Sequence, residues 1–473
     1  MNDITAIFAF LKYCLGYKRN MSRMIAGMDW QELYSFASKQ ALLGLCFEGI
    51  ERLGKEYSEE LRLNPIGREL LMTWMGKAQQ IRRQNMKVNA VASKLYSMLR
   101  EDGLRCCILK GQGNALIYPN AYSRNPGDID VWVNASRERI MEYAQKKFEL
   151  GDDIRLQHLE TSLDGVPVEL HFFPCSMNNP IYHARLQKWF RRNADLQCSH
   201  IVGLPDGAGD IAIPTTAFNV VYQLTHLYHH FFDEGIGMRQ IIDYYYVVCD
   251  FYKVYQNSSK ITPSLFFDKA SCTRQFESEL SLHSLASLFP LKGGSTSHPD
   301  PLTLRGEGGN RPTRCSEPLR SKDGGPSKVS PDCAGWDRLS IEGDNSAGST
   351  TVVTSYASTA LDVAQRELKY LGLWKFAGAV MYVLKEVLGL SEDKMIVPVD
   401  EKRGRLLLAE ILDGGNFGRH FSKYGGFTHQ SMGKKYFLKI WRNMHFVRYY
   451  PAEALCEPLF RTWHFFWRLK YKK

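Results

Sequence analysis

The stretch of residues 106–133 constrains the fold of this chain more than any other. It begins with an apolar run, is interrupted by Lys110-Gly111-Gln112-Gly113, and becomes extended and apolar again in the sequence DIDVWV, which starts at Asp128. Because side chains at positions i and i+2 of a strand point to the same face, Asp128 and Asp130 are expected to project together. The stretch therefore predicts two strands around a glycine-rich turn, with two carboxylates side by side.

Two carboxylates in this position need a cation. Like charges at short range disfavour each other's ionised form unless something positive lies between them. Hard divalent ions prefer oxygen ligands, so Mg²⁺ is the expected partner and Mn²⁺ is the alternative.

A β-hairpin is predicted shortly after this stretch. Two strand-like runs, residues 154–163 and 166–173, are joined by Asp164-Gly165, a two-residue signal for a tight turn. In the second run the aliphatic side chains share one face, which leaves Glu169 and His171 on the other. Glu169 is the expected third carboxylate, and His171 is expected in the wall of the site rather than as a ligand.

Three carboxylates on adjacent strands beside a glycine turn can hold a divalent metal and the phosphates of a nucleotide. Backbone N–H groups of the turn can cradle phosphate while metal ions bridge the oxygens of attacker and leaving group. The predicted chemistry is nucleotidyl transfer.

The same residues resemble a known family. LKG at the turn, then Arg124, DIDVWV and VELH, are similar to the pattern of the polymerase-β-type nucleotidyltransferase superfamily, and more narrowly to a mostly uncharacterised bacterial nucleotidyltransferase-like family. The resemblance implies that Asp128, Asp130 and Glu169 are the metal carboxylates. It also implies that Gly111-Gln112 meets the triphosphate, although Gln112 stands where many members have serine.

Lys110 and Arg124 are the basic residues expected at the phosphates. Lys110 would contribute a point charge, and Arg124 a bidentate contact from its planar guanidinium.

The chain is predicted to be an α+β protein, in which a small mixed β-sheet nucleotidyltransferase core is surrounded by helical segments. Its 473 residues exceed the usual length of one domain. The expected divisions are a helical N-terminal region (1–100), the nucleotidyltransferase core (101–200), a helical region (201–290), a disordered insertion (291–355) and a helical C-terminal region with a basic aromatic tail (356–473).

Periodicity and composition carry these divisions. Apolar residues recur at helical spacing in the N-terminal segments 30–38, 41–53 and 66–98, and again in 360–390. Residues 291–355 are rich in glycine, proline, serine and charge, without helical or strand periodicity, and such a composition buries too little apolar surface to become ordered.

Other helices are expected inside and after the core. One is predicted over residues 136–150, and another is predicted to be capped by Thr215 or Thr216. A further apolar segment, residues 406–412, precedes a glycine-rich turn at residues 414–418, for which a helix cap is favoured over a ligand contact.

The helix expected after Pro214 carries His226 and His230 one turn apart. This spacing can bind metal, but no third ligand follows at a fixed spacing, so neighbouring residues are expected to satisfy the two rings. On the next helix Arg239 and Asp243 are predicted to pair at i and i+4. This region resembles the same family and is expected to pack beside the nucleotide cleft.

The C-terminal stretch from Lys434 interleaves basic and aromatic residues. It could bind single-stranded nucleic acid, lie on an anionic membrane surface through residues 459–471, or dock its aromatic side chains in the protein. Docking is favoured, because the net charge is only +10 and no nucleic-acid-binding motif is evident.

The cellular setting is expected to be cytoplasmic. No apolar run is long enough to cross a membrane, and residues 1–20 lack the pattern of a secretory signal. The eleven cysteines, an odd number without a Cys-x-x-Cys motif, favour reduced thiols over a disulfide framework or zinc.

The predicted function is Mg²⁺-dependent transfer of a nucleoside monophosphate from a nucleoside triphosphate to an acceptor hydroxyl, with release of pyrophosphate. The acceptor could be a protein, a small molecule or a nucleic-acid end. The alternative is a catalytically inactive nucleotidyltransferase fold that acts as a binding or scaffold module.

Overall fold

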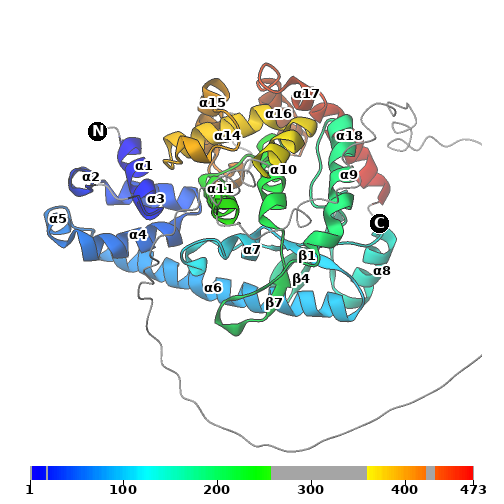
Figure 1. Cartoon of the computed structure of the whole chain (residues 1–473), viewed down its shortest axis with the longest axis horizontal. Helices are drawn as coiled ribbons and strands as arrows, with labels where there is room; N and C mark the ends of the chain where they lie inside the picture. Colours follow the sequence, from blue (N-terminus) through cyan, green and yellow to red (C-terminus); the bar gives the residue numbers. More distant parts are fainter. Residues whose placement is uncertain (1–2, 18–19, 257–359, 422–431, 472–473) are drawn as a thin grey trace, which may run out of the picture. The chain divides into compact units, whose positions relative to one another are not determined.

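The computed structural model describes residues 3–17, 20–256, 360–421 and 432–471 (Figure 1). All of them belong to one compact unit, Met1–Phe267 with Gly348–Lys473. The predicted disordered insertion, and residues 257–290 of the predicted helical region before it, lie outside the described residues.

The N-terminal region is helical, as its periodicity predicts. Its helices are α1 (Asp3–Cys14), α2 (Ser22–Ala26), α3 (Trp30–Lys39), α4 (Leu43–Glu56), α5 (Ser58–Leu63) and the long α6 (Arg68–Glu101). Helix α3 begins where the side chain of Asp29 accepts hydrogen bonds from the N–H groups of Gln31 and Glu32, at 2.9 and 3.0 Å.

A five-stranded mixed sheet follows α6 and confirms the predicted α+β class. Its elements in chain order are β1 (Cys106–Leu109), α7 (Gly111–Ala115), η1 (Ala121–Ser123), β2 (Ile129–Val133), α8 (Arg137–Lys147), β3 (Leu150–Ile154), β4 (His158–Leu163) and β5 (Val166–His171). The strand order is β1-β2-β5-β4-β3. The β2–β5 pair is parallel, and the other neighbours are antiparallel.

The hairpin of β4 and β5 has the predicted turn. Asp164 and Gly165 adopt φ of 50° and 70°, the left-handed conformation that a type I′ turn requires. The helix predicted over residues 136–150 is shorter than expected, because the chain turns extended at Phe148 and enters β3, a strand that the periodicity does not reveal.

The two faces of the sheet differ in chemistry. On β2 the side chains of Ile129, Val131 and Val133 join one apolar core, to which buried residues of α6 and α8 also contribute. The alternate residue Trp132 points to the opposite face, where its ring stacks on Phe218 of α10 with the centroids 6.3 Å apart. The carboxylates therefore lie on the face that the later helices cover.

The region after residue 200 is not helical from its start, contrary to the prediction. Helix α9 (Pro180–Gln197) is followed by β6 (Ile201–Gly203), η2 (Pro205–Gly207) and β7 (Asp210–Ala212). These two strands form a small antiparallel sheet, and β7 packs beside β1 and α6 (Figure 1). Strands this short carry too little alternation to be recognised in the sequence.

Helices complete the described chain: α10 (Thr216–Asp233), α11 (Met238–Gln256), a helical segment at residues 360–370, α14 (Trp374–Glu386), η4 (Glu392–Lys394), α15 (Glu401–Gly414), η5 (Asn416–Gly418), α16 (Met432–Met444), α17 (Pro451–Ala454) and α18 (Glu457–Tyr471). The predicted N-cap position Thr215 is right, although its side chain forms no capping hydrogen bond. Residues 360–390 are helical as predicted, but in two segments, because Gly372, at φ 73°, separates residues 360–370 from α14.

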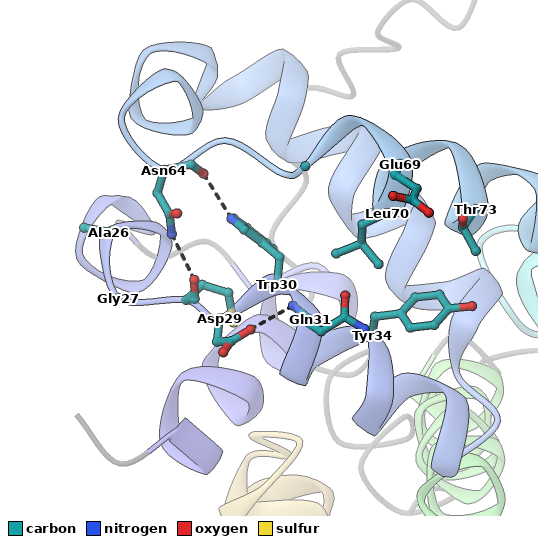
Figure 2. A pocket seen from close by; sticks show the side chains of 12 residues that line it. Ala26, Gly27, Asp29, Trp30, Gln31, Tyr34, Asn64, Glu69, Leu70 and Thr73 are labelled. Atoms are coloured by element: carbon teal, nitrogen blue, oxygen red, sulfur yellow. Dashed lines mark hydrogen bonds between the residues drawn. The ribbon is translucent and has the colours of Figure 1, made fainter.

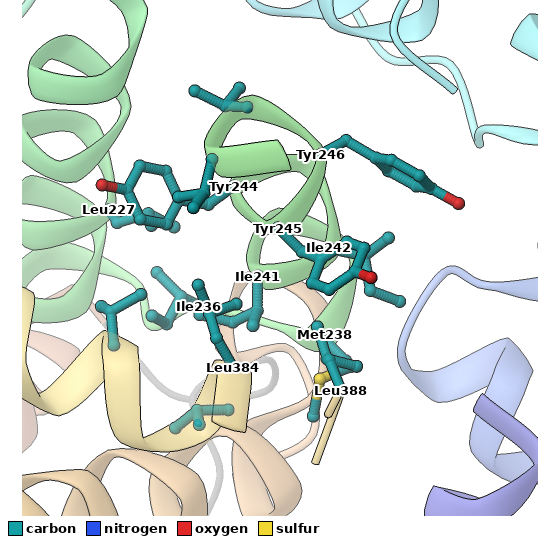
Figure 3. Packing of buried hydrophobic residues seen from close by; sticks show 14 of the residues in the cluster. Leu227, Ile236, Met238, Ile241, Ile242, Tyr244, Tyr245, Tyr246, Leu384 and Leu388 are labelled. Atoms are coloured by element: carbon teal, nitrogen blue, oxygen red, sulfur yellow. The ribbon is translucent and has the colours of Figure 1, made fainter. Parts of the chain in front are cut away.

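Helices α10, α11 and α14 enclose the centre of a second apolar core. This centre contains Leu227 from α10, Ile241 from α11 and Leu384 from α14 (Figure 3). Each of these residues is at most 1% exposed. Tyrosine side chains of α11 pack around this centre. This core fixes α10 and α11, which carry basic and polar residues of the candidate site.

The C-terminal tail docks in part. Arg442 is buried and donates to the carbonyl of Phe231 at 2.8 Å, while Arg461 lies 3.1 Å from Asp233. Phe437 and Trp441 on α16 remain more than 60% exposed. Within the described segments no helix combines the length and apolarity that crossing a bilayer requires.

Candidate active site

The predicted carboxylates come together at the start of β2 and the middle of β5. Asp130 on β2 lies in register with Glu169 on β5, so the two side chains are cross-strand neighbours on one face. Asp128 immediately precedes β2 and is exposed, whereas Asp130 is buried.

His171 joins the two strands. Its Nε2 lies 3.0 Å from Asp130 Oδ1 and 3.1 Å from Glu169 Oε2. Burial alone would lower the pKa of His171, but the hydrogen bonds to these two carboxylates raise it to about 9. The ring is therefore a cation at neutral pH, and it orients both carboxylates.

Lys110 immediately follows β1 and starts the turn. It has φ of 51°, a left-handed conformation that is uncommon for a residue other than glycine. Its Nζ lies 2.9 Å from Asp130 Oδ1 and 3.2 Å from Nε2 of His226 on α10. Burial would lower the pKa of Lys110, but the charges of Asp130, Asp128 and Glu169 raise it, so Lys110 stays protonated.

The pKa values of the two aspartates shift in opposite directions. Burial would raise the pKa of Asp130, but Lys110 and His171 hold it well below the ordinary value. The charge of Asp130, then loss of hydration, then the charge of Glu169 raise the pKa of Asp128 to about 6. Lys110 and His171 therefore compensate the charge of Asp130 more fully than that of Asp128.

The glycine turn lies against the loop that leads into Asp128. A Cβ built on Gly111 would be 3.8 Å from the Asp128 carbonyl oxygen. The side chain of Gln112 is 4% exposed and donates its amide to Asn89 of α6, so it anchors the turn to α6. Phosphate contacts at Gln112 would have to come from its backbone, since the side chain is already bonded.

Arg124 does not have the free guanidinium that its predicted phosphate contact requires. Its Nε and Nη2 donate to the two carboxylate oxygens of Asp243 on α11, at 2.7 and 2.8 Å, in a buried bidentate pair. The predicted pairing of Arg239 with Asp243 is also wrong, because Arg124 takes that carboxylate and Arg239 donates to the carbonyl of Asn125.

Two residues of β4 belong to the site and were not singled out from the sequence. Glu160 lies opposite Glu169, and His158 lies opposite His171. Burial and the charge of His171 lower the pKa of His158 to about 2, so its ring is neutral and its approach to Glu169, at 3.4 Å, is not an ion pair. Strand alternation in β4 was the available signal, since positions 158 and 160 share the face on which β5 carries Glu169 and His171.

The donors fit a hard divalent cation. Asp128, Asp130 and Glu169 offer carboxylate oxygens, the ligands that Mg²⁺ prefers. Asp128 forms no ion pair within the described ranges, and its raised pKa marks unneutralised negative charge that such a cation would offset. Donor atoms of His158, Glu169 and His171 also lie within 4.8 Å of one another, an arrangement with nitrogen ligands that suits a transition metal better than Mg²⁺.

His226 and His230 contact each other, with ring centroids 4.3 Å apart. Among the described residues they belong to no cluster with a third metal-binding side chain. The Nε2 of His226 faces Lys110, but its buried Nδ1 has no hydrogen-bond partner in the described part of the chain, so neighbouring residues satisfy this ring only in part.

A separate pocket of about 990 Å³ lies between the N-terminal helices (Figure 2). Some of its polar groups bond one another: Trp30 Nε1 donates to the Asn64 carbonyl at 3.0 Å, and the amide of Asn64 donates to the Met28 carbonyl at 2.9 Å. None of the carboxylates described above lines it, so it is distinct from the candidate active site.

The small mixed sheet brings an acidic pair at the start of β2 beside a third carboxylate on β5, close to a glycine turn, which is the arrangement expected from the resemblance to nucleotidyltransferases. Residues 26–261 match the family model described as "Uncharacterised nucleotidyltransferase", and this part of the chain belongs to that family. The match confirms the predicted resemblance and spans α3 to α11, including every residue of the candidate site. No curated protein and no solved structure matches the chain significantly.

Proposed function

We propose that the protein transfers a nucleoside monophosphate from a nucleoside triphosphate to an acceptor hydroxyl. One observation carries this proposal: Asp130 and Glu169 lie in register on parallel strands, and the backbone of Asp128 lies against Gly111 of the glycine turn. Family membership supports a general nucleotidyltransferase role.

In the proposed reaction the acceptor oxygen bonds to the α-phosphorus of the nucleotide. The bond from that phosphorus to the oxygen bridging the β-phosphate breaks, and pyrophosphate leaves with the electron pair. The hydroxyl proton passes to the Glu169 carboxylate and then to water. His171 orients Glu169 for this step by the contact of its charged Nε2 with Oε2.

Mg²⁺ would be held by Asp128, Asp130 and Glu169, with Mn²⁺ as a substitute. Bound there, the metal supplies positive charge to the phosphate oxygens and lowers the pKa of the acceptor hydroxyl. Lys110 forms an ion pair with Asp130. Once a cation shares that carboxylate, the Lys110 ammonium group would also interact with the phosphates. Gly111 lets the backbone approach the phosphates closely.

A non-catalytic binding or scaffold role is the second candidate. It is favoured by the fact that Arg124, a predicted phosphate contact, is bonded to Asp243 instead. The side chain of Gln112, in the turn predicted to meet the triphosphate, is bonded to Asn89. The acceptor, the cytoplasmic location and any contact of the basic aromatic tail with nucleic acid or membrane remain predictions.

The test is transfer of label from the α-phosphate. The purified protein is incubated with Mg²⁺, cell lysate and each of the four nucleoside triphosphates in turn, beside the double variant Asp128→Asn/Asp130→Asn. Labelled product with the intact protein alone supports the enzyme and reveals base preference and acceptor size. Absence of label, together with metal-independent nucleotide affinity or none, favours the scaffold.

A further inference from the structure

Arg239 is a buried arginine with an incomplete set of partners. It lies in the first turn of α11 and is 8% exposed. Its Nη1 donates to the carbonyl of Asn125 at 3.1 Å, and its Nε has no hydrogen-bond partner. A guanidinium has five N–H donors in a fixed fork, and the buried Nε–H of this one is left without an acceptor among the residues that the structure describes.

The carboxylate nearest in sequence does not satisfy it. Asp243, one turn further along α11, gives both oxygens to Arg124. Within the described ranges Arg239 forms no ion pair, although an unpaired buried charge is costly. An anion from outside the chain would complete its bonding.

The guanidinium lies at the candidate active site. A Cβ built on Gly127 would be 3.9 Å from Arg239 Nη1, and Gly127 immediately precedes Asp128. The carbonyl of Asp128 in turn faces Gly111 of the glycine turn. Arg239 therefore flanks the loop into Asp128, while Lys110 contacts Asp130 on the same face of the sheet.

An aromatic ring holds the guanidinium in place. Its central carbon is 5.4 Å from the ring centroid of Phe417 in η5, a cation–π distance. Phe417 has φ of 55°, a strained conformation for an aromatic residue. The loop reaches this position because Gly237 has no side chain: a Cβ there would lie 2.7 Å from the Asn416 Cα.

We propose that Arg239 binds the polyphosphate of the nucleotide, the contact predicted from the sequence for Arg124, and that Phe417 positions its guanidinium. This inference rests on the proposed function, because it assigns a phosphate contact to the same site. It also brings η5, which lies beyond the matched family segment, into the nucleotide site.

The test measures binding of inorganic tripolyphosphate with Mg²⁺ by calorimetry. Arg239→Lys keeps the charge but removes the fork, and it should weaken binding about ten- to hundred-fold, the value of a charge-assisted hydrogen-bond pair. Phe417→Leu should weaken it about three-fold. Arg191→Lys, on the exposed surface of α9, is the matched control and should bind as the unaltered chain does.

A melting curve is recorded for each variant, so that a loss of tripolyphosphate binding in Arg239→Lys can be separated from a loss of folding. Unchanged tripolyphosphate affinity in that variant, or no binding to the unaltered chain, overturns the inference. If tripolyphosphate binding depends on Arg239 but no nucleotidyl label is transferred, Arg239 stands and the proposed enzyme fails. If label is transferred and Arg239→Lys leaves KM unchanged, the enzyme stands and the role of Arg239 fails.

Discussion

Replacing Asp128 with asparagine should stabilise the metal-free protein while removing its response to metal. The pKa of Asp128 is raised to about 6 by Asp130 and Glu169, from an ordinary value near 4. The folded state therefore binds this proton more tightly than the unfolded state does. Ionised Asp128 therefore destabilises the folded state. This destabilisation is absent below about pH 4, grows as pH rises towards 6, and is complete above 6.

The magnitude follows from the shift. Two pKa units correspond to about 2.7 kcal/mol, but Asp128 is exposed to solvent, which screens the repulsion, so on the order of 1 kcal/mol is expected. For a chain of this size that gain raises Tm by about 2 °C at pH 7.5. At pH 4 the gain should disappear, because Asp128 is then protonated.

The assay is thermal unfolding at the two pH values, with and without Mg²⁺ or Mn²⁺. Asp362→Asn, at an exposed position of the helical segment 360–370, is the control and should change nothing. In the unaltered chain the metal should raise Tm, and in Asp128→Asn it should not. A variant that is destabilised at pH 7.5, or that keeps the full metal response, would refute the reasoning.

Three further substitutions, one of them with a matched comparison variant, test the surrounding charges. Lys110→Met leaves buried Asp130 without its ammonium partner and should cost about 3 kcal/mol of unfolding free energy in urea, whereas Lys94→Met, in the exposed pair with Asp164, should cost less than about 1 kcal/mol. Arg124→Lys cannot reproduce the two bonds to Asp243 and should cost about 2 kcal/mol; a loss below about 0.5 kcal/mol would contradict the bidentate pair. The raised pKa of His171 contributes about 3 kcal/mol of folding stability, which is present below pH 6.5 and is lost as pH rises through 9. In a pH series of urea midpoints, His171→Gln should flatten this decline in stability. An equally steep decline in the variant would exclude His171 as its source.

Local patterns in the sequence were enough to predict that Asp128, Asp130 and Glu169 come together in the fold. The alternation in DIDVWV and the Asp164-Gly165 turn fix which residues share a face, because both depend on neighbours a few positions apart. The pairing of Asp130 with Glu169 then follows once β2 and β5 are adjacent. The same alternation in β4 would have indicated His158 and Glu160.

The partners of the arginines could not be predicted in this way. Arg124 and Asp243 are separated by 119 positions and meet only after α11 has packed in the second core. Sequence spacing favoured the local pair of Arg239 with Asp243, which is worth a few tenths of a kcal/mol on an isolated helix. The buried bidentate contact from Arg124 replaced it, and this left Arg239 facing the loop before Asp128.

Short elements were also missed for physical reasons. β6 and β7 have three residues each, and the break at Gly372 lies inside an apolar pattern that continues on both sides. Periodicity needs a longer window than these features provide.

The central claim is that Asp128, Asp130 and Glu169 form a centre for nucleotidyl transfer. Its most direct test compares two batches of the preferred nucleoside triphosphate, labelled at the α-phosphate or at the γ-phosphate, with the intact protein and with Glu169→Gln. The account predicts that the α label enters the acceptor, that the γ label appears in pyrophosphate, and that Glu169→Gln abolishes both. Entry of the γ label into the acceptor, or equal α transfer by Glu169→Gln, would contradict it.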